Sequence, residues 1–89
     1  MAMEDENKPP LNLLLYTTLG CHLCEQAKLC LDQITEIDYE LSEIEISETD
    51  ALMKKYQVRI PVLGIEDSDK ELDWPFTEAG IRKFLNVFS

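Results

Sequence analysis

The amino-acid sequence predicts an α/β domain in which a mixed four-stranded sheet carries helices on its faces. The main observation is that apolar residues switch repeatedly between strand and helix spacing, in the order β-α-β-α-β-β-α. The first β-α-β segment implies two parallel strands joined by a right-handed crossover, and the last two strands imply a hairpin. With 89 residues, the chain has room for one domain with a thin hydrophobic core.

A polar lead-in precedes the first strand and the first helix. Residues 1–10 are acidic and end in two prolines, so we expect a flexible arm before a domain over residues 11–89. Residues 11–18 form a short apolar run that predicts a strand buried on both faces. Helical spacing then predicts a helix over about residues 22–34, with an apolar stripe made of Leu23, Ala27, Cys30, Leu31 and Ile34.

The middle of the chain predicts a second strand followed by a short helix. Polar and apolar residues alternate over residues 38–46, which is typical of a half-exposed strand. The alternation slips once between Leu41 and Ile44, so we expect a bulge or a strand end there. Residues 47–50 are typical of a helix start, and the apolar face that follows consists of Leu52, Met53 and Tyr56.

The C-terminal third predicts a hairpin and a final helix. Residues 58–64 return to strand character with Pro61 at the start, and residues 70–73 can pair back across a polar turn at residues 66–69. In the final helix Thr77 is the expected cap, and the apolar face consists of Ile81, Phe84, Leu85 and Phe88.

The charge balance restricts the partners that this chain can bind. Eight basic and eighteen acidic side chains give a formal net charge of −10 and a pI near 4.3. Nucleic acids and anionic membranes bind through clusters of Lys and Arg, so neither is an expected partner. The longest apolar run spans only residues 13–16, against about 20 residues for a membrane span. Since residues 1–10 also lack the pattern of a secretion signal, we expect a soluble, cytoplasmic monomer.

Two of the three cysteines form a C-x-x-C pair at the predicted strand-to-helix junction. Cys21 directly follows Gly20, where the first amides of the helix and the positive end of its dipole would stabilise a thiolate. Cys24 lies one helical turn further on, within reach of Cys21. This arrangement suits thiol–disulfide exchange, in which Cys21 attacks a disulfide and Cys24 resolves the mixed disulfide.

A structural zinc site is the main alternative for such a pair. Zinc normally takes four ligands, and this chain offers only Cys21, Cys24, Cys30 and His22. Because His22 lies between the paired cysteines and there is no second ligand pair, we predict no metal site. We interpret Cys30 as a small core residue, since it shares the apolar stripe of the helix.

The cysteine pair and a later segment resemble those of a known family. Residues 14–27 read L-L-Y-T-T-L-G-C-H-L-C-E-Q-A, and residues 55–63 read K-Y-Q-V-R-I-P-V-L. Over about residues 12–88, the sequence resembles the glutaredoxin-like family of the thioredoxin superfamily. The resemblance implies a thioredoxin-like fold with helices on both faces of the sheet, with Cys21 as the nucleophile and Cys24 as the resolving thiol.

The candidate substrate-binding residues lie near the cysteine pair. The resemblance implies that one of them, Pro61, is a cis proline packed beside the pair. A cis bond turns the Ile60 backbone outward, where an extended substrate can pair with it as an added strand. Tyr16, which ends the first strand beside the pair, could contact substrate or pack in the core. His22 and Leu23 lie between the two cysteines and complete the candidate substrate-binding residues.

The surroundings of the cysteine pair differ from those of glutaredoxins proper. Such proteins usually carry a Lys shortly before the pair, whereas residues 17–20 hold no cation here. Glu25 also follows Cys24 directly. Both differences are expected to leave the Cys21 thiolate less stabilised than in a site that has the lysine.

The glutathione site of glutaredoxins has no clear counterpart in this sequence. That site resembles T-V-P at the cis proline and a later G-G-x-x-D segment, whereas residues 59–61 read R-I-P and residues 67–74 read D-S-D-K-E-L-D-W. Arg59 could pair with a substrate carboxylate or with an acid of its own chain. Glutathione is therefore doubtful as the reductant.

The sequence as a whole predicts a thiol–disulfide oxidoreductase that uses the Cys21–Cys24 couple and no other redox cofactor. Its substrate would be a disulfide in a protein or a small molecule, and its reductant is not identified by the sequence. Two alternatives belong to other classes. One is a carrier of an iron–sulfur cluster or metal held between two chains through Cys21, and the other is a non-catalytic adaptor with a thioredoxin fold.

Overall fold

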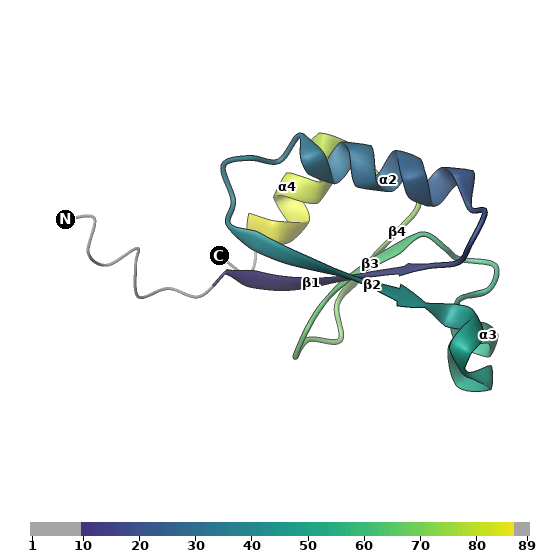
Figure 1. The fold of residues 1–89 in the computed structure, drawn as a ribbon. Helices are drawn as coiled ribbons and strands as arrows, with labels where there is room; N and C mark the ends of the chain where they lie inside the picture. Colours follow the sequence, from purple (N-terminus) through teal and green to yellow (C-terminus); the bar gives the residue numbers. More distant parts are fainter. Residues whose placement is uncertain (1–9, 87–89) are drawn as a thin grey trace.

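The computed structural model describes residues 10–86, which form one four-stranded sheet with helices on both faces (Figure 1). The strands are β1 (Leu11–Thr17), β2 (Tyr39–Glu45), β3 (Val62–Ile65) and β4 (Glu71–Asp73). The helices are α2 (His22–Asp32), α3 (Asp50–Tyr56) and α4 (Glu78–Asn86), and a short 3-10 helix, η1 (Ile46–Glu48), precedes α3. The predicted α/β architecture is confirmed. Residues 1–9 of the expected arm and Phe88 lie outside the described residues.

The strand order in the sheet is β2-β1-β3-β4. β1 pairs in parallel with β2, whereas β3 pairs antiparallel with both β1 and β4. Both the predicted parallel pair and the predicted hairpin are therefore present. Tyr16 near the end of β1 lies opposite Val62 at the start of β3. This register brings the segment before Cys21 and the segment around Pro61 to the same end of the sheet.

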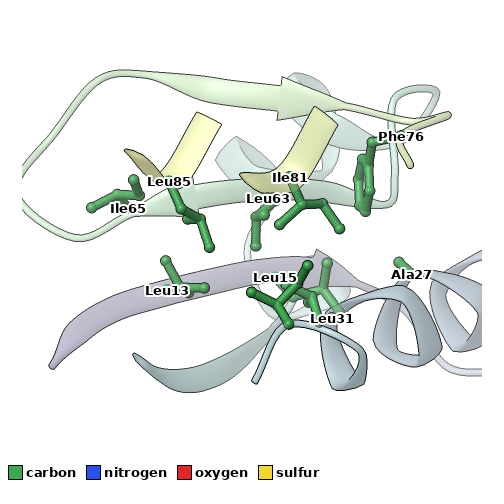
Figure 2. Close-up of a cluster of buried hydrophobic side chains, with 10 residues drawn as sticks. Leu13, Leu15, Ala27, Leu31, Leu63, Ile65, Phe76, Ile81 and Leu85 are labelled. Carbon is green, nitrogen blue, oxygen red and sulfur yellow. The ribbon is translucent and has the colours of Figure 1, made fainter. Parts of the chain in front are cut away.

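The larger part of the core lies on the sheet face that α2 and α4 cover (Figure 1). Figure 2 shows Ile81 and Leu85 of α4 directed toward leucines of the sheet. The buried residues of this larger cluster are Leu13, Leu15, Ala27, Leu31, Ile34, Leu63, Ile65, Phe76, Ile81 and Leu85. Burying this apolar surface supplies most of the driving force for folding.

A smaller cluster lies on the opposite face, beneath α3. Its buried members are only Ile46, Tyr56 and Val62. Side chains that are partly buried pack against them, and these are Tyr16, Leu52, Met53 and Ile60. Thr49 begins α3 as its cap, since its Oγ1 accepts a hydrogen bond from the Leu52 amide at 3.1 Å.

The strands differ from the sequence prediction in two details. β1 and β2 pair residue for residue from Leu11 and Tyr39 to Thr17 and Glu45, so neither the expected bulge nor the expected strand end occurs between Leu41 and Ile44. The apolar phase of that segment slips because Tyr39 and Leu41 pack on the larger cluster, whereas Ile46 belongs to the smaller one. β3 is the strand that is buried on both faces, whereas every second side chain of β1 is only half-buried or exposed, because the short α3 covers little of that face.

The expected apolar stripe of α2 is wrong at its first turn. Leu23 is 43% exposed, and the side chain that faces the sheet there is Cys24, followed by Ala27 and Leu31. The helix begins at His22, and from that start Cys24 falls in phase with the buried residues. Cys30 is half-buried against the larger cluster, consistent with a core role.

The start of β3 differs from the prediction, whereas the cap of α4 agrees with it. β3 begins at Val62 and not at Val58, because Val58 is 91% exposed in the turn that follows α3. Thr77 caps α4 as predicted, since its Oγ1 accepts a hydrogen bond from the Gly80 amide at 3.1 Å.

Within residues 10–86, no helix combines the length and apolar character that a membrane crossing requires.

Candidate active site

A tight turn carries the chain from β1 into α2 and places Cys21 at the helix start. The Cys21 amide donates a hydrogen bond to the Thr18 carbonyl at 3.3 Å. Gly20 occupies the third position of this turn with a φ of +78°, a left-handed conformation that favours glycine. The turn delivers Cys21 to the N-cap of α2, where its Sγ accepts a hydrogen bond from the Cys24 amide at 3.1 Å.

The two cysteines lie at disulfide distance, with their Cα atoms 5.3 Å apart. They are unequally accessible, because Cys24 is only 2% exposed whereas Cys21 is half-buried. A partner approaching from solvent therefore meets Cys21 before Cys24. The helix start contributes unpaired amides and the positive end of the helix dipole to the same position.

Ile60 and Pro61 directly precede β3, and the pairing of Tyr16 with Val62 brings the start of β3 to the end of the sheet where Cys21 follows β1. The bond between them is cis, as is the bond between Trp74 and Pro75. Pro61 is buried and Ile60 half-buried. The Ile60 amide donates to the Tyr56 carbonyl at 3.1 Å, so the Ile60 carbonyl is the backbone group left for pairing with an added strand.

The remaining candidate substrate-binding residues lie in two different places. His22 and Leu23 are exposed in the first turn of α2, beside Cys21. Tyr16 lies on the face of the sheet opposite to α2, where its ring stacks on the Tyr56 ring with centroids 4.1 Å apart. Of the two alternatives for Tyr16, substrate contact and core packing, this position agrees with packing against the smaller cluster.

A pocket of about 410 Å³ opens beside Cys21. Its lining comes from the end of β1, the start of α2 and the end of β2, namely residues 17–22, Glu25, Lys28, Glu43 and Glu45. Neither Ile60 nor Pro61 contributes to it. Cys21 therefore has two different flanks, the pocket on the β2 side and the Ile60–Pro61 segment on the β3 side.

The pocket carries more negative than positive charge. Its three carboxylates face one ammonium group, since Lys28 Nζ lies 3.2 Å from Glu25 and 3.5 Å from Glu43. The Glu45 carboxylate accepts hydrogen bonds from Thr18 Oγ1 at 2.8 Å and from the Ser47 amide at 3.1 Å, and these bonds lower its pKa. The excess charge beside the disulfide is thus negative at neutral pH.

The β3 flank has a polar cluster that sequence reasoning missed. The Arg59 guanidinium lies 2.8 Å from a carboxylate oxygen of Glu71 and 2.8 Å from one of Asp73, so it pairs with acids of its own chain. The Tyr56 hydroxyl donates a short hydrogen bond to the Glu71 carboxylate. The sequence placed Tyr56 on an apolar helix face. The only indication of this cluster was the expectation that Arg59 could pair with an acid of its own chain.

The contacts of this cluster shift the pKa values of its members, and the hydrogen bonds to Asp73 and Glu71 raise that of Arg59. Burial and the hydrogen bond to Glu71 raise the pKa of Tyr56 far above that of a free tyrosine. Burial alone would raise the pKa of Glu71, but hydrogen bonds from Tyr56 and Arg59 and the nearby positive charges lower it overall. At neutral pH, the cluster therefore holds a protonated phenol beside an ionised carboxylate.

A metal site requires several ligand side chains grouped around one ion. In the part of the chain that the structure describes, no three or more His, Cys, Asp or Glu side chains are grouped so that they could hold a metal ion.

The fold and the site together define a small thioredoxin-like domain with a C-x-x-C pair at the start of its first helix. The sequence profile of the glutaredoxin-like domain family (DUF836) matches residues 12–86, and the chain belongs to this family. No curated protein matches the chain.

Solved structures of similar chains support the same fold. Target protein XcR50 from X. campestris is 35% identical, with a TM-score of 0.74 over 86% of this chain and 99% of that one. Protein Ne2328 from Nitrosomonas europaea is 30% identical, with a TM-score of 0.72 over 88% of this chain and 94% of that one. These likenesses confirm the thioredoxin-like fold predicted from the sequence.

Proposed function

We propose that this protein is a thiol–disulfide oxidoreductase in which Cys21 is the attacking thiol and Cys24 the resolving thiol. The observation that carries the proposal is the position of the pair. Cys21 caps a helix and is the more exposed sulfur, while Cys24 is buried one turn behind it at disulfide distance. This asymmetry suits a division of labour between a thiol that meets substrate and a thiol that releases it.

The reaction balances with the two cysteines alone. The Cys21 thiolate attacks one sulfur of the substrate disulfide, and the other substrate sulfur leaves as a thiolate that takes up a proton. The Cys24 thiol then loses its proton and attacks Cys21, which releases the second substrate thiol and closes the Cys21–Cys24 disulfide. Two electrons and two protons pass to the substrate, and a separate dithiol reductant restores the pair.

The protein supports this step through backbone electrostatics. The Cys24 amide already points at the Cys21 sulfur, at 3.1 Å, and the helix dipole favours negative charge at the same position. The nearest ionised groups of the pocket work in the opposite direction, because Glu25, Glu43 and Glu45 outnumber Lys28. We expect the thiolate to depend mainly on the helix start.

The same acidic pocket supports a proposal about the substrate. Glutathione disulfide carries net negative charge, so it would be repelled by the carboxylates beside Cys21. A disulfide whose flanking groups are neutral or positively charged would be attracted. We therefore place disulfide-bearing peptides or proteins with basic neighbouring residues before glutathione as substrates.

The test is a single-turnover reaction of the fully reduced protein with a neutral small disulfide, bis(2-hydroxyethyl) disulfide. Loss of the substrate disulfide is measured in acid-quenched samples taken over time, and alkylation with mass spectrometry reports the state of each cysteine. Cys21→Ser should lose the reaction by more than about a hundredfold, because its hydroxyl is a poor nucleophile at neutral pH. Cys24→Ser should accumulate the mixed disulfide on Cys21, and Cys30→Ser serves as the matched control with unchanged rate.

Two outcomes would contradict this proposal. One is equal activity of wild type and Cys21→Ser. The other is a wild-type protein whose paired thiols do not oxidise together in a series of defined redox buffers. In either case the cysteine pair is not the redox couple of an exchange reaction.

A further inference from the structure

The polar cluster on the β3 flank joins four separate parts of the chain. Tyr16 comes from β1, Tyr56 ends α3, Arg59 lies in the turn before β3, and Glu71 begins β4. The Tyr56 ring stacks on Tyr16, and the Arg59 guanidinium carbon lies 5.2 Å from the Tyr56 ring centroid. Glu71 accepts hydrogen bonds from both the Tyr56 hydroxyl and Arg59.

Backbone hydrogen bonds connect this cluster to the Ile60–Pro61 segment, which would bind substrate. The Tyr56 carbonyl accepts hydrogen bonds from the Arg59 amide at 2.8 Å and from the Ile60 amide at 3.1 Å. The position of Tyr56 thus fixes the residue that precedes Pro61. Through the Tyr16 stack, the same side chain is tied to β1, the strand that leads into the Cys21 turn.

The contacts are sheltered enough to restrict motion. Tyr56 is 2% exposed, and the Glu71 side chain is 19% exposed. Arg59 is held at two carboxylates, Glu71 on one side and Asp73 on the other, which restricts its guanidinium more than a single contact would. The ion pairs of the pocket on the β2 flank are more open to solvent, since the Glu25 side chain is 71% and the Glu43 side chain 49% exposed.

We propose that Tyr56 and Arg59 are positioning residues that hold the Ile60–Pro61 segment at the correct distance from Cys21 for an extended peptide substrate. This inference rests on the proposed function. It adds a distinction between substrates, because an extended peptide would pair with the Ile60 carbonyl, whereas a small disulfide needs only the cysteines. Loss of the cluster should therefore weaken reaction with the peptide and spare the small disulfide.

The test compares two substrates that share one leaving group. One is bis(2-hydroxyethyl) disulfide, and the other is an extended peptide whose single cysteine is joined to 2-mercaptoethanol. Arg59→Gln should lower the second-order rate constant for the peptide about tenfold, as small displacements of substrate-positioning groups do, and change that for the small disulfide less than about twofold. The midpoint of the Cys21–Cys24 couple in redox buffers should not move.

Three further variants sharpen the result. Tyr56→Phe keeps the ring stack and removes only the hydroxyl, so it should lower the peptide rate by about threefold and remain folded. Arg59→Lys keeps the charge but not the planar fork, and it should restore part of the loss. Arg82→Gln is the matched control, because Arg82 pairs with Glu36 and Glu78 away from the cysteine pair.

The outcomes separate this inference from the proposed function. Equal slowing of both substrates by Arg59→Gln and Tyr56→Phe would mean that the cluster only supports the fold, and the inference would be overturned. Unchanged peptide rates in both variants would overturn it as well. A wild-type protein that reduces neither substrate would instead refute the proposed function.

Discussion

The two faces of the sheet are built for different tasks. The face under α2 and α4 buries ten apolar residues, whereas the face under α3 buries three and adds ion pairs and hydrogen bonds around Tyr56. Apolar burial is strong but not directional, while hydrogen-bonded contacts fix distances. The comparison indicates that one face supplies stability and the other holds the shape of the segment before Pro61.

The largest effect on stability is expected in the larger cluster, under α2 and α4. Leu31→Ala removes a side chain that is 1% exposed in the larger cluster, and it should lower the free energy of unfolding by about 3 kcal/mol. Leu52→Ala, on the α3 face and only half-buried, should cost about 1 kcal/mol because its site can relax toward solvent. Urea unfolding of both variants measures the difference, and equal losses would mean that the α3 face contributes as much stability as the other.

A smaller effect is expected at the turn that leads into the site. Gly20→Ala forces a Cβ into a left-handed conformation and should lower the free energy of unfolding by about 1 kcal/mol. Gly64→Ala is the matched control on the α3 face, since a Cβ there would lie 3.5 Å from Tyr16 Cε2, an ordinary contact. Thermal unfolding compares the two, and a larger loss at Gly64 would show that the α3 face is packed more tightly than its small cluster indicates.

The smallest effect is a difference in the acid dependence of stability. The pKa of Glu71 is lowered in the folded protein from its usual 4.5, so ionised Glu71 stabilises the fold above that pH. This contribution is lost as the pH falls through the lower, folded pKa. Glu71→Gln should therefore flatten the decline of stability below about pH 4.5.

Glu36→Gln is the control for that experiment. Glu36 also pairs with an arginine, Arg82, but the pair lies away from the Tyr56 cluster and is well exposed. Its removal should change the acid profile less, because solvent screens exposed ion pairs. A profile that is equally flattened by both substitutions would contradict a special role for the sheltered carboxylate.

The backbone of this protein was predictable because short patterns determine it. Glycine before the cysteine pair, helical spacing after it, and Pro61 at a strand start led to the correct order of elements and the correct pairing. The same local reasoning failed for Leu23, since the face of α2 that packs depends on where the helix begins. It failed for the alternation over residues 38–46 too, because Tyr39 and Leu41 of β2 pack on the larger cluster whereas Ile46, in η1, belongs to the smaller one.

The site was predictable only in part, for a related reason. Cys21 and Cys24 are three residues apart, and their relation follows from one helical turn. The hydrogen bonds that Tyr56 and Arg59 make to Glu71 join residues twelve to fifteen positions apart. The stacked rings of Tyr16 and Tyr56 lie still further apart in the sequence. No spacing rule connects such residues, and the acidic pocket likewise forms only when β2 comes beside α2.

β2 lies at the margin of the sheet, with one row of backbone groups open to pairing by another chain. Its sequence places Glu40, Glu43 and Glu45 along that margin. Two copies that met edge to edge would bring these carboxylates together, so their repulsion opposes the growth of β-aggregates at neutral pH. That protection depends on the net negative charge of the chain, so the purified protein should precipitate most readily near its pI of about 4.3.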